Sequence, residues 1–65
     1  MKLYIVKRFN KYTAKVVVQN KEKQTLYEGR VFNIPMRFLN KDILDIEPML
    51  DENNKEVIKI IIKED

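Results

Sequence analysis

Serine, histidine, cysteine and tryptophan are all absent from this chain of 65 residues, and glycine occurs once. Without serine, cysteine or histidine, the chain lacks the usual nucleophiles and the imidazole base of enzymes. A single glycine, Gly29, also excludes a glycine-rich phosphate-binding loop. Disulfides are excluded, as are zinc sites built from thiolates or imidazoles. We therefore expect a binding protein with no cofactor, and not an enzyme.

Carboxylates are the remaining candidates for a metal site. Asp45 and Glu47 are two residues apart in a predicted strand and would share one face, with Asp42 nearby. Mg²⁺ and Ca²⁺ take oxygen ligands, but a protein site for Ca²⁺ gathers more of them than converge here. We expect a solvated acidic face and no bound metal.

Long hydrophobic runs are missing as well. The N-terminal apolar run covers residues 3–6 and is followed by Lys7 and Arg8, so it is too short for a signal peptide or a membrane span. The lack of cysteine suits a reducing compartment, and we expect a cytoplasmic protein that does not enter a membrane. The length allows one small domain, residues 1–65, whose limited core a homodimer could extend.

The apolar residues that are present recur with a period of two, which is typical of half-buried strands. Val16 and Val18 alternate with polar or outward positions, and so do Ile58, Ile60 and Ile62. The pattern predicts five strands, at about residues 2–9, 12–20, 24–34, 42–50 and 56–63. Between the third and fourth strands, residues 35–41 begin with proline and predict a single helical turn, with an extended crossover as the alternative.

The glycine lies inside the third predicted strand. Strict alternation would place Glu28 on the same face as Leu26. A bulge at residues 28–29 would reset the register, so that Leu26 points inward while Tyr27, Arg30 and Phe32 point outward. We interpret the glycine mainly as a bend that closes a small barrel.

Short hairpin loops with one longer link predict an all-β fold, a small five-stranded antiparallel barrel of OB-like or SH3-like type. The stretch KDILDIE at 41–47, an acidic turn and EVIKIII at 56–62 resemble the last hairpin of S1-type OB-fold domains. That family usually has glycine where this chain has Lys41. The resemblance implies an OB-like barrel that presents its second and third strands to nucleic acid.

Charge is divided along the chain. Residues 1–41 hold ten Lys or Arg and two acids, a net charge of +8, whereas residues 42–65 hold three Lys and eight acids, a net charge of −5. Basic residues neutralise phosphates, and aromatic rings stack on bases. We therefore expect binding of nucleic acid, preferably single-stranded, through Lys15, Tyr27, Arg30 and Phe32, with Arg8 and Arg37 as supporting phosphate contacts.

A protein partner is the alternative hypothesis. Several apolar side chains fall on the presumed outer faces, and a contiguous apolar patch or a free strand edge would mark an interface. On this hypothesis the chain is an interaction module or inhibitor, a small accessory protein such as mobile elements carry, that contacts a larger protein or a second copy. The candidate interface residues are Tyr4, Val6, Val17, Val57 and Ile61.

Overall fold

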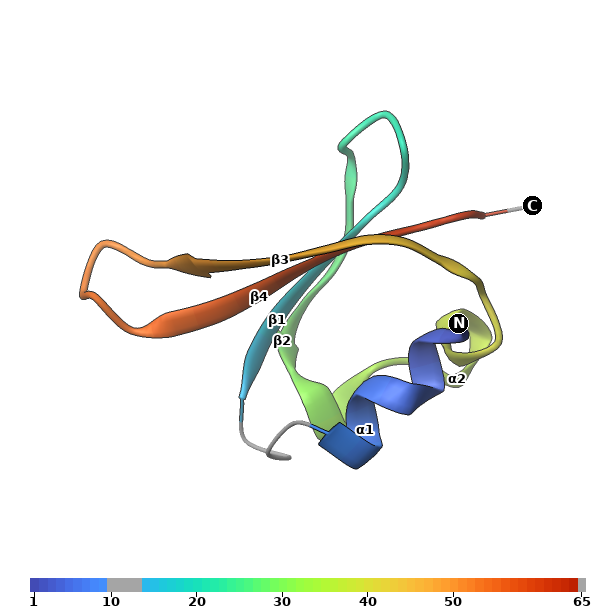
Figure 1. Ribbon diagram of the computed structural model, residues 1–65, viewed down its shortest axis with the longest axis horizontal. Helices are drawn as coiled ribbons and strands as arrows, with labels where there is room; N and C mark the ends of the chain where they lie inside the picture. Colours follow the sequence, from blue (N-terminus) through green and yellow to red (C-terminus); the bar gives the residue numbers. More distant parts are fainter. Residues whose placement is uncertain (10–13, 65) are drawn as a thin grey trace.

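A four-stranded sheet forms the centre of the computed structural model, which describes residues 1–9 and 14–64 (Figure 1). The strands lie in the order β2-β1-β4-β3. The two hairpins β1–β2 and β3–β4 are antiparallel, and the central strands β1 and β4 are parallel. The strand bounds are Lys15–Gln19 for β1, Thr25–Arg30 for β2, Ile43–Leu50 for β3 and Glu56–Ile62 for β4.

The predominance of β structure is confirmed, but the closed five-stranded barrel is wrong. Residues 2–9, predicted as the first strand, form the 3-10 helix η1 (Leu3–Ile5) and the helix α1 (Val6–Phe9). Buried Leu3 and Val6 are three residues apart, the spacing of one helical turn. In the described part of the chain no strand joins β2 to β3, so the sheet is open, and it is mixed because β1 and β4 are parallel.

The link between the hairpins contains the predicted helical turn. After β2, the chain forms the 3-10 helix η2 (Val31–Asn33) and then the helix α2 (Met36–Leu39). The turn predicted at 35–41 is therefore confirmed, and Pro35 occupies its N-cap position. The third predicted strand, 24–34, is too long, because Val31 begins η2. Residues 10–13, which include the start of the predicted strand 12–20, lie outside the described residues.

The helical segments cover one face of the central strands, and the core lies between them (Figure 1). The inward positions predicted in β1 and β4 are confirmed. The side chains at these positions pack against apolar side chains of residues 1–9 and of the link between the two hairpins. The buried cluster consists of Leu3, Val6, Val16, Val18, Val31, Ile34, Phe38, Ile60 and Ile62.

The two hairpin loops share one geometry. The Oδ1 atom of Asn20 accepts hydrogen bonds from the backbone N–H groups two and four residues later, and the Oδ1 atom of Asp51 does the same. In each loop the fourth residue has a positive φ, 65° at Lys23 and 61° at Asn54. This is the three-residue hairpin loop in which a type I turn is followed by a left-handed residue.

Gly29 has a packing role, and the predicted bulge lies elsewhere. The register of β1–β2 shifts between Val18 and Gln19, which leaves Leu26 as the extra residue. As a result, both Leu26 and Tyr27 pack against the core. The Tyr27 ring lies over Gly29, where an added Cβ would approach the tyrosine hydroxyl to 2.8 Å.

Candidate nucleic-acid interface

Two segments far apart in the sequence form one layer of helical turns, residues 1–9 and 31–41, which we call the helical layer. Helix α1 contacts η2, and α2 contacts η1. These segments contain five Lys or Arg and no Asp or Glu. Most of the basic excess of the N-terminal half therefore lies in the helical layer and not on strand faces.

The core of the protein dictates which side chains of the helical layer are exposed. Leu3, Val6 and Phe38 are buried, so the positions between them turn outward. Tyr4 and Phe32 are about half exposed, at 44% and 51% of their surface. The layer thus offers aromatic side chains among cationic ones, the combination that single-stranded nucleic acids bind.

Some cations of the layer are already engaged by acceptors within the chain. The Lys2 Nζ lies 3.0 Å from a carboxylate oxygen of Asp42, and the Lys41 Nζ donates to the Glu64 backbone carbonyl at 2.6 Å. Lys2 lowers the pKa of Asp42, by a hydrogen bond first and by its charge second. These contacts tie the layer to the sheet, so Lys2 and Lys41 have structural roles.

Among the described residues, the remaining cations of the layer have no carboxylate partner. Within residues 1–9 and 14–64, no ion pair involves Lys7, Arg8 or Arg37. The Arg37 guanidinium lies over the Phe38 ring, with its carbon 4.6 Å from the ring centroid. This cation–π contact holds Arg37 at the surface directly above the core.

The structure separates the six residues predicted to bind nucleic acid. Arg8, Phe32 and Arg37 lie in the helical layer, and Arg30 directly precedes it. Lys15 is elsewhere, in β1, where its Nζ lies 3.3 Å from Glu28.

Tyr27 is also outside the helical layer. Its ring is half-buried against the core, and its hydroxyl donates to the Arg30 carbonyl at 2.6 Å. Tyr27 pairs with buried Val18 and therefore lies on the core face of the sheet. Lys15 is three residues from Val18 in β1, so its side chain points to the opposite face. They therefore do not form one site.

The candidates for a protein interface do not form one surface either. Val6 and Val57 are buried, and Val17 and Ile61 are half-buried on the sheet face that points away from the helical layer. Tyr4 is exposed, but it belongs to the helical layer. The sequence analysis assigned Tyr4 to the protein interface and did not name Lys7 as a binding residue, although the absence of acids from 1–9 and 31–41 was visible in the sequence.

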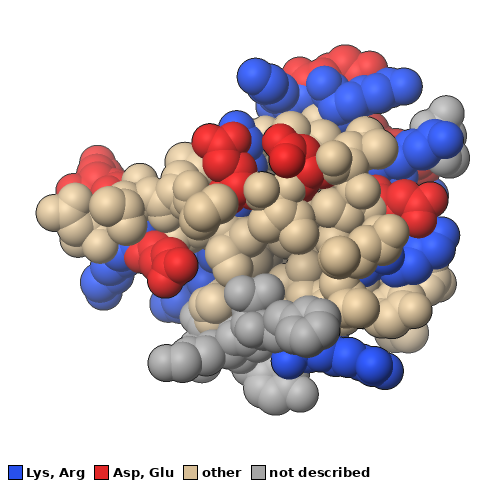
Figure 2. Space-filling model, viewed as in Figure 1, with Lys and Arg blue, Asp and Glu red and all other residues tan. Residues whose placement is uncertain are grey.

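Charges of both signs occur on the face shown in Figure 2. Lys and Arg side chains border its right-hand side, over the helical segments, with some carboxylates among them. Next to Lys15, a hollow of about 670 Å³ likewise mixes signs; its lining residues are Ala14, Lys15, Arg30, Asp51, Asn53, Lys55 and Glu56. Because Asp51 and Glu56 lie among its three cations, the strand end around Lys15 is not a purely cationic surface.

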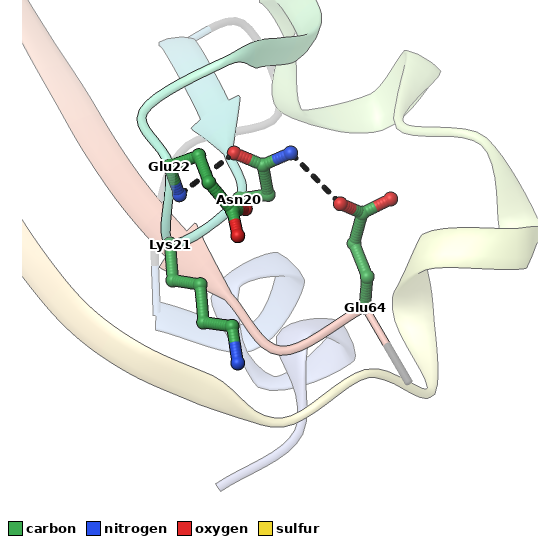
Figure 3. A pocket seen from close by; sticks show the side chains of 4 residues that line it. All are labelled: Asn20, Lys21, Glu22 and Glu64. Carbon is green, nitrogen blue, oxygen red and sulfur yellow. Dashed lines mark hydrogen bonds between the residues drawn. The ribbon is translucent and has the colours of Figure 1, made fainter.

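A polar cluster around Asn20 is structural (Figure 3). The Asn20 side chain accepts from the backbone N–H groups of Glu22 and Gln24 and donates to Gln24 Oε1 and Glu64 Oε1, both at 2.8 Å. Its amide therefore has four partners and none to spare for a ligand. The adjoining hollow, about 310 Å³, is lined by Asn20, Lys21 and the carboxylates of Glu22 and Glu64.

The described part of the chain contains neither a metal-binding cluster nor a membrane-spanning helix. Across the described ranges 1–9 and 14–64, no three His, Cys, Asp or Glu side chains gather closely enough to hold a metal ion. In the same ranges, no helix has the length and apolar character needed to cross a bilayer.

No family model, curated protein or solved structure matches this chain. The resemblance of residues 41–62 to S1-type OB-fold domains therefore stays a prediction.

Proposed function

We propose that this protein binds single-stranded nucleic acid, without catalysis, through the helical layer. The observation that carries the proposal is that residues 1–9 and 31–41 come together with five cations, no acid and two exposed aromatic rings. Lys7, Arg8 and Arg37 would neutralise phosphates, while Phe32 and Tyr4 would stack on bases. The face is thus one built by helical turns, in place of the strand face expected from the sequence.

Fluorescence anisotropy with a labelled single-stranded oligonucleotide tests this proposal. Three phosphate contacts predict that the logarithm of the association constant falls with the logarithm of salt concentration with a slope of roughly −2. Arg8→Gln and Arg37→Gln should each make that slope shallower by roughly 0.7. Lys55→Gln removes the same charge at the far hairpin and should leave both slope and affinity nearly unchanged.

The aromatic contribution has its own variant. Phe32→Ala should weaken binding by about 1–3 kcal/mol if the ring stacks on a base. Its exposure means that the fold should survive, which circular dichroism would verify. Failure to bind at low salt, or binding to vesicles containing phosphatidylserine without binding to oligonucleotides, would refute the proposal.

A further inference from the structure

The β3–β4 hairpin exposes apolar side chains at the end of the molecule away from the helical layer (Figure 1). Ile46, Pro48 and Leu50 share the sheet face that carries the core, because they pair with Ile60, Ile58 and Glu56. The helical layer does not reach this end of the hairpin, so these side chains stay exposed, Leu50 by 62%. Met49, which pairs with Val57, lies on the opposite face at the same end of the hairpin. The four exposed side chains form what we call the hairpin patch: Ile46, Pro48, Met49 and Leu50.

A groove lies within the hairpin patch. It is a shallow, open groove of about 370 Å³, lined by Pro48, Met49, Leu50, Asn54 and Glu56. Leu50 and Glu56 are direct cross-strand partners, so the carboxylate lies beside an apolar wall. Among the described residues no cation forms a salt bridge with Glu56, which also borders the hollow that holds Lys15, Arg30 and Lys55.

Two features disfavour a second copy of β3 as the occupant. The Asp51 N–H donates to the Lys55 carbonyl, and from this pair hydrogen-bonded and non-hydrogen-bonded pairs alternate along β3 and β4. Pro48 and Ile58 form a non-hydrogen-bonded pair, so the backbone of Pro48 faces the free edge of β3 and not β4. Proline lacks an N–H, so an added strand would lose a hydrogen bond there. An antiparallel copy centred on Asp45–Glu47 would also bring carboxylates opposite one another, which is destabilising.

Charge indicates the kind of partner. Residues 48–57, the end of the hairpin that carries the patch, contain three acids and one lysine, a net charge of −2. Lys and Arg have an apolar stem with a cationic end, which matches a groove with an apolar wall and a carboxylate. We propose that the hairpin patch is a second binding surface, which docks a segment of a partner protein carrying apolar side chains next to Lys or Arg, with one basic side chain in the groove against Glu56.

Nuclear magnetic resonance of the full ¹⁵N-labelled chain tests this proposal with two probe peptides. One is the acetylated, amidated sequence Leu-Arg-Leu-Arg, and the other replaces both arginines with glutamate. The arginine peptide should shift the amide resonances of residues 49, 50, 54 and 56 in a saturable way. The glutamate peptide should bind at least tenfold more weakly.

Variants locate the contact. Glu56→Gln should lower the affinity for the arginine peptide at least threefold, and Leu50→Asp should abolish binding of that peptide. Phe32→Asp, which places the same charge on a comparably exposed apolar residue of the helical layer, should not change it. Equal binding of the two peptides, shifts confined to other residues, or a dimer through the hairpin patch in sedimentation equilibrium would overturn the proposal. Leu50→Asp should leave oligonucleotide affinity intact, so the two proposals fail or succeed separately.

Discussion

Asn20 and Asp51 occupy equivalent positions in the two hairpin loops, yet they differ in charge for a local reason. Both side chains accept from two backbone N–H groups with Oδ1. Asn20 also donates through Nδ2, to Gln24 and Glu64, and a carboxylate could not do this. Asn20 is 3% exposed, so the difference decides which residue the position accepts.

Replacing asparagine by aspartate at position 20 and aspartate by asparagine at position 51 should therefore change the free energy of unfolding by unequal amounts. Asn20→Asp should cost about 1–3 kcal/mol, because the two hydrogen bonds that Nδ2 donates are lost and a second carboxylate comes next to Glu64. Asp51→Asn preserves the acceptor at Oδ1 and should change the urea midpoint little at pH 7. Equal losses in urea unfolding of the two variants would contradict this account.

Lys23 carries backbone strain that its equivalent, Asn54, avoids. Both have φ near 60°, a region that asparagine tolerates better than lysine does. Lys23→Asn should raise the free energy of unfolding by up to about 1 kcal/mol. Lys21→Asn makes the same chemical change at a residue without positive φ and should be nearly neutral; thermal unfolding of both would decide.

Among the elements, β1 and β4 could be predicted from the sequence, because buried positions alternate with less buried ones in β1 and in the C-terminal part of β4. Val16 with Val18, and Ile60 with Ile62, mark the core face of β1 and β4 without ambiguity. The N-terminal segment could not be assigned in this way. Leu3 and Ile5 fit a period of two, Leu3 and Val6 fit a helical turn, and only the packing of the segment against the sheet decides between the two.

Replacement of one leucine in each kind of element tests this assignment. Leu3 is fully buried in the core, whereas Leu44 in β3 is 50% exposed. Leu3→Ala should cost about 2–5 kcal/mol in urea unfolding, the range for buried leucines. Leu44→Ala should cost far less, and a similar loss at both positions would mean that η1 does not pack as described.

For the whole molecule, the sequence predicted a division of charge but not its geometry. The helical layer gathers cations from residues 1–9 and 31–41, while the acids of residues 43–62 lie on the hairpin that extends away from it (Figure 1). Strand counting could not predict this, because it placed residues 2–9 in the sheet. Arg8, Phe32 and Arg37 were correctly expected at the surface, whereas the core contact of Tyr27 depends on a bulge that no local pattern marks.

Acid should weaken the fold through carboxylates with lowered pKa values. The hydrogen bond and charge of Lys2 lower the pKa of Asp42, and the backbone N–H of Lys55 is the main cause for Asp51. Their stabilisation is complete above the ordinary value of 3.8 and is lost as pH falls through the lower folded values. Between pH 5 and pH 3, the urea midpoint of Asp42→Asn should therefore fall less than that of the unmodified chain. An identical loss would show that the Lys2–Asp42 pair contributes nothing.

The parallel pairing of β1 with β4 has a consequence for synthesis of the chain. The two central strands, Lys15–Gln19 and Glu56–Ile62, are separated by more than half of the sequence. On the ribosome, β1 and β2 can form a hairpin early, but its apolar face has no central neighbour until β4 emerges. Because such distant pairings slow folding, we expect the nascent chain to expose Val16 and Val18 until β4 has left the ribosome, a period in which it depends on chaperones or on rapid synthesis of the intervening residues.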